Sequence, residues 1–300
     1  MIKMIIPVCL PLLILAAPAQ ADEPYASVSL RVRQADGSFA QVDTYVRPRS
    51  TTMKGWPIAF EGIGWESDRI AYRLYLDARY VTDIYGKRLP GPVLDHIGQG
   101  RNDYTAPSPW GQDVFQVGNS LGIGGLGLLR DGIATQVGPS DITAKVVENG
   151  PAKAVAEVDN DGVDGGGHLH AAYSLKAGST VTEVNASGTG LQHPLVAGFA
   201  DHHVTVLRST LKLGATWAYV ASWGKQSLAG DDLGLVIFYR LADVVGPPAS
   251  DGQSLYVQFR DPKSAHYAFA ARWQAESGGE GAVNDKAAFI SWLDATLARF

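Results

Sequence analysis

Charged, aromatic and glycine residues are unusually dense between Phe60 and Gly127. The segment begins FEGIGWESDRIAYRLYLDARYVTDIYGKR and continues, after Leu89, as loops with His, Asp, Tyr and Trp between glycines and prolines. Loops of this kind usually carry the binding groups of a rigid scaffold. Tryptophan rings stack on sugar faces, while carboxylates, guanidinium groups and amides bind hydroxyl groups. The cluster therefore predicts a ligand site, and a network of buried ion pairs that holds long loops in place is the alternative.

The elements that must position these residues are strands and turns. The stretch Arg69–Leu76 alternates, so a strand here places Arg69, Ala71, Arg73 and Tyr75 on one face. Short apolar runs between turn signals recur along the chain, which is typical of an all-β sandwich. Further strands are predicted at Ala26–Arg33, Ala144–Val147, Ala154–Val158, His168–Leu175, Thr180–Ser187, Val204–Leu213, Tyr219–Ser222, Gly234–Phe238, Leu255–Phe259 and Tyr267–Trp273.

Only the C-terminal segment Asn284–Phe300 has a clear helical pattern. Its apolar residues recur at spacings of three and four, and Asn284 or Asp285 is the predicted N-cap. No repeat, linker or composition break divides the chain. We therefore predict that residues 22–300 form a single domain, a large antiparallel β-sandwich with a C-terminal helix. The residues on the apolar face of the helix are Ala288, Phe289, Trp292, Leu293, Thr296 and Leu297.

The N-terminus has the pattern of a cleavable signal peptide. Lys3 precedes an uncharged run, and Ala19-Gln20-Ala21 is a small-x-small cleavage site. The apolar run is shorter than the roughly 20 residues that span a bilayer, so no membrane anchor is expected after cleavage. Residues 1–21 are predicted to be removed after Ala21, with Cys9 among them, which predicts a periplasmic or secreted protein without disulfides.

Charge and motifs exclude several classes of function. The formal net charge is −5, which argues against nucleic acid as a partner but not against a polyanionic sugar, because a site needs only a few local cations. Gly122–Gly127 matches G-x-G-x-x-G, yet no helix start follows, so a close approach of backbone to another segment is favoured over nucleotide binding. His168 and His170 share a strand face, but no third ligand is apparent. No metal or cofactor is expected.

The cluster also carries a family resemblance. Trp65-Glu66-Ser67-Asp68-Arg69 with Ala71-Tyr72-Arg73 resembles a motif of the bacterial family known as domain of unknown function 4861. The chain departs from that family's pattern at Ser67, often asparagine, and at Thr105, often histidine, so the second departure removes an imidazole from the region. The resemblance continues through Asp83, Tyr85-Gly86-Lys87, Asp103-Tyr104, Trp110-Gly111, Asp113, Val117–Gly122 and Gly124-Gly125, with weaker similarity at Ala177-Gly178-Ser179, Trp223-Gly224-Lys225 and Tyr267–Ala270.

The resemblance implies a β-sandwich of the supersandwich type that mutarotase-like and polysaccharide-lyase proteins share. It also implies activity on acidic plant or algal oligosaccharides, since at least one similar protein is an oligosaccharide dehydratase. The chemistry expected on that basis is the elimination of water or a sugar from a uronate. The expected partner is an acidic oligosaccharide.

Elimination from a uronate requires a cation at the carboxylate, a base for the neighbouring carbon and an acid for the leaving oxygen. Arg69 and Arg73 would offer the carboxylate a bidentate grip. A nearby guanidinium would favour ionisation of Tyr104, which would then act as the base. His96 would serve as the acid or as the alternative base.

Other residues of the chain are assigned to substrate binding. Trp110 and Trp223 are predicted to stack sugars, and Glu66, Asp68, Asp113 and Lys225 to bind hydroxyls or to hold the arginines. A non-catalytic carbohydrate-binding protein, a sugar epimerase or mutarotase, and a glycoside hydrolase with paired carboxylates remain alternatives.

Overall fold

The computed structural model describes residues 23–51, 54–99, 104–276 and 282–300. The predicted signal peptide, residues 1–21, lies outside the described residues, as does Asp103 of the family motif. In the described parts of the chain, the helices are too short or too polar to cross a bilayer.

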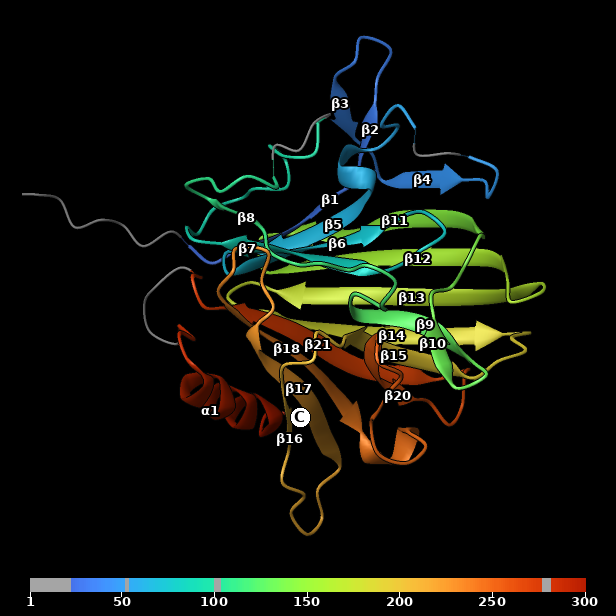
Figure 1. The fold of residues 1–300 in the computed structure, drawn as a ribbon. Helices are drawn as coiled ribbons and strands as arrows, with labels where there is room; N and C mark the ends of the chain where they lie inside the picture. Colours follow the sequence, from blue (N-terminus) through green and yellow to red (C-terminus); the bar gives the residue numbers. More distant parts are fainter. Residues whose placement is uncertain (1–22, 52–53, 100–103, 277–281) are drawn as a thin grey trace, which may run out of the picture.

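The largest element is an antiparallel nine-stranded sheet with the order β16-β17-β18-β21-β14-β13-β12-β11-β4 (Figure 1). Tight glycine-containing turns connect its long central strands, which is why strands that are neighbours in the sequence are mostly neighbours in the sheet. The strands are β4 (Thr44–Arg47), β11 (Asp141–Gly150), β12 (Lys153–Val163), β13 (Gly167–Lys176), β14 (Val181–Thr189), β16 (Thr205–Arg208), β17 (Trp217–Lys225), β18 (Asp232–Arg240) and β21 (Ala265–Trp273).

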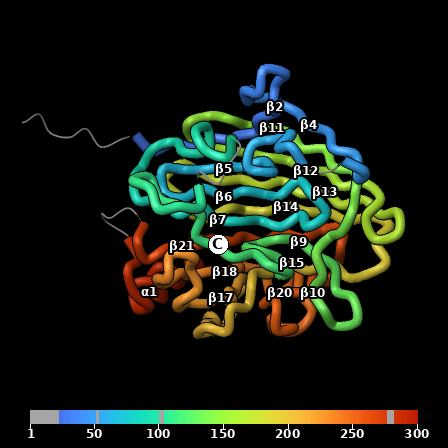
Figure 2. The backbone as a smooth tube through the Cα atoms, turned by 45° about the horizontal axis from the view of Figure 1, so that its top comes forward, coloured from blue at the N-terminus to red at the C-terminus, as the bar shows by residue number. Residues whose placement is uncertain are grey.

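Two five-stranded sheets form the facing layer. The first, with the order β1-β5-β6-β7-β8, contains β1 (Ala26–Ser29), β5 (Gly62–Ser67), β6 (Ile70–Tyr75), β7 (Thr82–Lys87) and β8 (Gly111–Asp113). The second, with the order β10-β9-β15-β20-β19, contains β9 (Ile123–Arg130), β10 (Ile133–Thr135), β15 (Leu195–Ala200), β19 (Ala249–Ser250) and β20 (Ser254–Gln258). A bridge between Thr82 and Gly122 joins the two, and Figure 2 shows β5, β6, β7, β9 and β15 as successive strands of one layer.

Smaller elements complete the chain. A hairpin of β2 (Arg31–Arg33) and β3 (Phe39–Gln41) projects from the layer that contains β1. Two 3₁₀ turns, η1 (Ala59–Glu61) and η2 (Leu241–Asp243), lie before β5 and after β18. The only helix longer than one turn among the described residues is α1 (Lys286–Leu297).

The main hydrophobic core lies between the two layers. Trp65 of β5 stacks on Tyr173 of β13 with ring centroids 4.8 Å apart, and its indole nitrogen donates to Thr182 Oγ1 at 2.9 Å. Strand β18 is buried on both faces: Leu235 and Ile237 belong to this core, while Phe238 belongs to a second core under α1. The prediction of an all-β sandwich with a C-terminal helix is confirmed.

The helix α1 covers the outer face of the nine-stranded sheet near β17 (Figure 1). Phe289 and Leu293 are fully buried there, on the predicted apolar face. Asp285 caps the helix by accepting a hydrogen bond from the Ala288 amide at 2.8 Å. The predicted helix is therefore confirmed, with Asp285 and not Asn284 as its N-cap.

The structure confirms a strand over most of Arg69–Leu76 but begins it at Ile70, with Arg69 in the preceding turn. It also corrects other strand boundaries. Tyr72 and Leu74 enter the main core, whereas Ala71 packs under the loops on the opposite face. The predicted strand Ala26–Arg33 is interrupted at Leu30, and only Thr205–Arg208 of the stretch Val204–Leu213 is a strand. Strands β5, β7 and β15 are not among the predicted strands, because both of their faces are buried and their residues do not alternate between apolar and polar.

The expected close approach at Gly122–Gly127 is also confirmed. Gly124 has a φ of +63°, and a Cβ placed there would lie 2.1 Å from the ring of Phe269. A Cβ at Gly125 would lie 1.9 Å from the Leu121 carbonyl oxygen. These glycines therefore let β9 pack against β21 and against its own preceding turn.

The fold predicts a specific role for the hydroxyl of Tyr72. This buried group donates to the Thr180 carbonyl at 2.7 Å and accepts from the Ala271 amide at 2.9 Å, so it joins the two layers. We expect Tyr72→Phe to lower the free energy of unfolding by about 1–3 kcal/mol, because two buried backbone groups lose their partner. Urea unfolding measures the change.

Tyr173→Phe is the matched control for this prediction. Tyr173 is equally buried, but its hydroxyl makes only a 3.4 Å contact with Tyr80. We expect a loss below about 1 kcal/mol. Equal losses in the two variants would contradict the proposed link between the layers.

Candidate functional site

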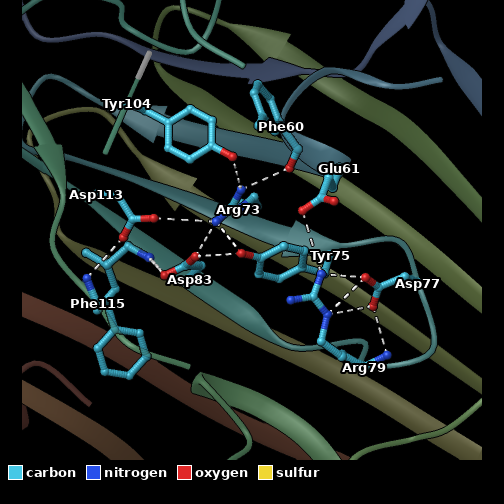
Figure 3. Close-up of polar contacts among 11 residues, drawn as sticks. Phe60, Glu61, Arg73, Tyr75, Asp77, Arg79, Asp83, Tyr104, Asp113 and Phe115 are labelled. Carbon is cyan, nitrogen blue, oxygen red and sulfur yellow. Dashed lines mark hydrogen bonds and ion pairs between the residues drawn. The ribbon is translucent and has the colours of Figure 1, made fainter. Parts of the chain in front are cut away.

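The guanidinium group of Arg73, on β6, is the centre of a buried polar cluster (Figure 3). Arg73 is 1% exposed, and its Nη2 forms an ion pair with Asp83 and a hydrogen bond with the Tyr75 hydroxyl. Its Nη1 donates to the Tyr104 hydroxyl at 3.2 Å, and Nη2 lies 3.6 Å from Asp113 Oδ2. We call Arg73, Tyr75, Asp83, Tyr104 and Asp113, together with Tyr85, the Arg73 cluster.

Strand pairing brings the cluster together. Arg73 lies directly opposite Asp83 in the β6–β7 ladder, and Tyr85 lies opposite Asp113 in the β7–β8 ladder. Because side chains alternate along a strand, these residues share the face of the sheet that points away from the main core. The connection between β7 and β8 covers this face and brings Tyr104 over Arg73, where the Asp113 amide donates to the Tyr104 carbonyl at 2.6 Å.

The two carboxylates of the cluster, Asp83 and Asp113, share one cation, Arg73. Asp83 pairs directly with Arg73. Burial raises the pKa of Asp113 to about 8, the Asp83 carboxylate adds to the rise, and Arg73 only partly opposes it. Asp113 is therefore a proton-carrying group near neutral pH.

Tyr104 does not ionise as the sequence analysis expects. Burial raises its pKa above the usual value, and the favourable effect of the Arg73 guanidinium is smaller. The expectation considered the cation alone and omitted the desolvation that accompanies it. Tyr104 thus keeps its proton and is available as a hydrogen-bond donor.

Two polar atoms of the cluster have no partner in the parts of the chain that the structure describes. These are the hydroxyl of Tyr85 and Nε of Arg73, and both side chains are at most 1% exposed. The Arg73 guanidinium carbon lies 5.2 Å from the centroid of the Tyr85 ring. Buried polar groups without partners are rare in native proteins, so the cluster retains unused hydrogen-bonding capacity for a ligand or water.

A charged rim connects the cluster to the surface. The guanidinium of Arg79 lies 3.7 Å from the centroid of the Tyr75 ring, and the Arg79 side chain is 37% exposed. It pairs with Asp77 at 2.5 Å and lies 3.7 Å from Glu61 (Figure 3). Tyr104 and Asp113 are 5% and 6% exposed, so neither is completely buried.

Four residues predicted for the site lie elsewhere. His96 is exposed, and its described hydrogen bond is made by its backbone amide. Arg69 lies in the turn between β5 and β6, so it does not join Arg73 in gripping one carboxylate. Trp223 is 4% exposed and packs on Phe289 of α1 at 5.0 Å, where it cannot stack a sugar.

Lys225 is the fourth of these residues, at the end of β17. Its side chain is 69% exposed and lies 3.5 Å from Asp232. The sequence pattern could not separate these residues from the site, because only strand order decides which sheet face each one joins. In the structure Trp223 and Lys225 belong to the nine-stranded sheet, on the other side of the main core from the cluster.

Three other predicted binding residues make structural contacts outside the cluster or at its edge. Glu66 is 1% exposed, pairs with Lys87 at 2.9 Å and accepts from the amides of Val93 and Leu94. Asp68 accepts from the Gly178 amide at 2.7 Å. Trp110 is half-buried and meets the Tyr85 ring edge-on at 6.4 Å. Glu66 and Asp68 therefore anchor loops, as in the ion-pair alternative.

Tyr75, Tyr85, Asp83 and Arg79 were not assigned to the site from the sequence. A usable signal existed for three of them, because Tyr75 and Arg73 share a face in the predicted alternation, and Asp83 and Tyr85 belong to the family pattern. Their partners, however, depend on the register of β6 against β7.

The fold and the site together define an all-β sandwich protein with a loop-covered, arginine-centred polar cluster. The family model described as "Domain of unknown function (DUF4861)" matches residues 16–300, and the chain belongs to that family. This confirms the resemblance drawn from the motifs. Comparison with curated proteins gives no match.

The raised pKa of Asp113 predicts that the stability of the protein depends on pH. Its folded pKa of about 8 lies above the value of about 3.9 expected in an unfolded chain, so between these values the folded state holds the extra proton. The contribution of Asp113 to stability is complete below about pH 4 and is lost as the pH rises through about 8. We expect Asp113→Asn, which cannot ionise, to gain stability relative to wild type as the pH rises over this range.

Urea unfolding at a series of pH values tests this prediction. Asp141→Asn is the control, because the hydrogen bond from Arg49 lowers the pKa of Asp141 and its titration lies below the tested range. The difference between wild type and Asp141→Asn should stay constant. A constant difference for Asp113→Asn as well would show that Asp113 ionises normally.

Proposed function

We propose that this protein is exported and that it eliminates water or a sugar from uronate-containing oligosaccharides, with the Arg73 cluster as its catalytic centre. The signal-like N-terminus supports export. The observation that carries the proposed chemistry is the pairing of two proton-carrying groups, Tyr104 and Asp113, on one buried guanidinium at 3.2 and 3.6 Å.

Each requirement of the elimination has a candidate group. Arg79 on the rim binds the substrate carboxylate, which makes the hydrogen on the neighbouring carbon acidic. Ionised Asp113 removes that hydrogen as a proton, and the electrons of the broken C–H bond form the carbon–carbon double bond. The bond to the leaving oxygen breaks, and this oxygen takes the proton of Tyr104. Arg73 stabilises the resulting phenolate until Asp113 returns the proton through water.

This assignment revises the roles inferred from the sequence. Tyr104 becomes the acid because burial keeps it protonated. Asp113 becomes the base, and its pKa of about 8 gives it useful basicity near neutral pH. His96 has no role, since it lies exposed and outside the cluster.

The proposal predicts that Tyr104→Phe and Asp113→Asn each lower turnover by about 100-fold or more, the usual loss when a general acid or base is removed. Turnover on a panel of uronate oligosaccharides is followed by ultraviolet absorbance of the unsaturated product. Mass spectrometry then distinguishes dehydration from chain cleavage. Wild-type turnover should rise with pH as Asp113 ionises near pH 8.

Tyr173→Phe serves as the control for this experiment, because Tyr173 lies in the main core and not in the cluster. It should retain wild-type turnover. Unaltered product formation by Tyr104→Phe would remove Tyr104 from the mechanism. Binding of uronate oligosaccharides without any turnover would support the non-catalytic alternative instead.

A further inference from the structure

A groove made of two adjoining hollows lies on the outer face of the nine-stranded sheet, beside α1. Its main part has a volume of about 1010 Å³ and continues into a second hollow of about 630 Å³, with Thr216, Trp217 and Phe300 lining both. We call this depression the α1 groove. Its walls come from β13, β14, β16, β17, β18, β21, α1, the β16–β17 connection and the residues that follow α1, together with Arg69 of the β5–β6 turn.

The α1 groove is distinct from the Arg73 cluster. Side chains of β13 and β21 alternate, so Tyr173 and Phe269 enter the main core while Lys176 and His266 line the groove. The main core and the nine-stranded sheet therefore separate the two places.

Positive charge is concentrated in the α1 groove. Its lining contains seven cationic side chains but only two acidic ones, Glu183 and Asp294, in a chain with a formal net charge of −5. The cations are Arg69, Lys176, Arg208, Arg240, Arg272, Lys212 and Arg299. Such local concentration attracts an anionic ligand irrespective of the sign of the whole protein.

Several of these cations are available to a ligand. The Lys176 side chain is 70% exposed, and its Nζ lies 3.8 Å from a carboxylate oxygen of Glu183. The Arg240 side chain is 48% exposed, and its Nη1 lies 3.8 Å from a carboxylate oxygen of Asp243. Arg69 and Arg299 make no ion pair with any residue that the structure describes. Arg272, by contrast, is buried in a pair with Glu276 and supports Trp292 through a cation–π contact.

Aromatic rings also line the α1 groove, and Trp217 and Phe300 lie where its two hollows meet. Trp217 stacks on Phe300 with centroids 4.5 Å apart, and the His266 ring meets Trp217 edge-on at 5.2 Å. Trp217 and Trp292 are only partly buried and line the main hollow. Partly exposed aromatic rings beside guanidinium groups suit a ligand with apolar sugar faces and anionic substituents.

We propose that the α1 groove is a second carbohydrate-binding site that holds an extended acidic oligosaccharide. The guanidinium and ammonium groups bind its carboxylate or sulfate groups, and Trp217 and Trp292 contact its rings. This inference rests on the proposed function for its substrate class. Two adjoining hollows, both lined by cationic side chains, suit a chain of several sugars better than a single anion.

Calorimetric titration with oligogalacturonate, a sulfated oligosaccharide and a neutral malto-oligosaccharide of equal length tests the groove. We expect binding of one or both acidic chains, weakened by added salt, and no binding of the neutral chain. The double variant Lys176→Gln/Arg240→Gln should bind about tenfold more weakly, since a charge-assisted hydrogen bond is typically worth about 1.4 kcal/mol or more.

A matched double variant controls for net charge. Lys225→Gln/Arg49→Gln removes two cations whose side chains are 69% and 47% exposed and lie outside the groove, so it should bind like wild type. Equal weakening of both double variants, or binding of a single-stranded DNA oligonucleotide as tight as that of oligogalacturonate, would overturn the assignment.

The same titrations separate this inference from the proposed function. Groove-dependent binding without turnover supports the α1 groove and counts against elimination. Turnover that depends on Tyr104, with no effect of Lys176→Gln/Arg240→Gln on binding, supports elimination and overturns the groove.

Discussion

The ion pair between Arg73 and Asp83 is the interaction on which the outer face of the β1-β5-β6-β7-β8 sheet depends. A buried guanidinium without a partner would be strongly destabilising, and β6 and β7 place the required carboxylate directly opposite it. Once Asp83 balances Arg73, no second cation remains for Asp113. Burial therefore keeps a proton on Asp113 near neutral pH, so strand register creates an acid–base group.

A second buried pair explains how the cover over this face is held. Glu66 and Lys87 pair on the same face, and Glu66 also accepts from the amides of Val93 and Leu94 in the covering connection. Arg31 donates to the carbonyls of Asp95 and Ile97 in the same connection. The described residues contain no cysteine, so charged hydrogen bonds and not disulfides hold this connection in place.

The charged segment combines the two kinds of residue that the sequence analysis weighs, a structural ion-pair network and a candidate ligand site. Glu66 and Lys87 satisfy one another and the backbone, as an ion-pair network that holds loops should. The Arg73 cluster differs because the Tyr85 hydroxyl and Arg73 Nε lack partners, and because its acids and phenols outnumber its single cation. Buried polar atoms without partners therefore distinguish the candidate site from the structural network.

Local patterns predicted the fold class, the alternation along β6 and the helix α1, because each follows from periodicity within one element. They could not predict that Asp83 lies opposite Arg73, since pairing is a property of two strands and their register. The same local patterns assigned Trp223 to ligand binding, because the sequence of a strand does not distinguish a buried aromatic residue from an exposed one. The helix that covers Trp223 is far away in the sequence.

The distribution of charge completes the physical argument. A net charge of −5 argues against a general affinity for polyanions, yet a ligand responds to the electrostatic field where it binds. On one side of the molecule, Arg73 is matched by acids and buried; on the other, the α1 groove gathers cations with few acids between them. The two faces of the sandwich can differ in this way because the apolar core isolates them, so each sheet face acquires its own electrostatic character.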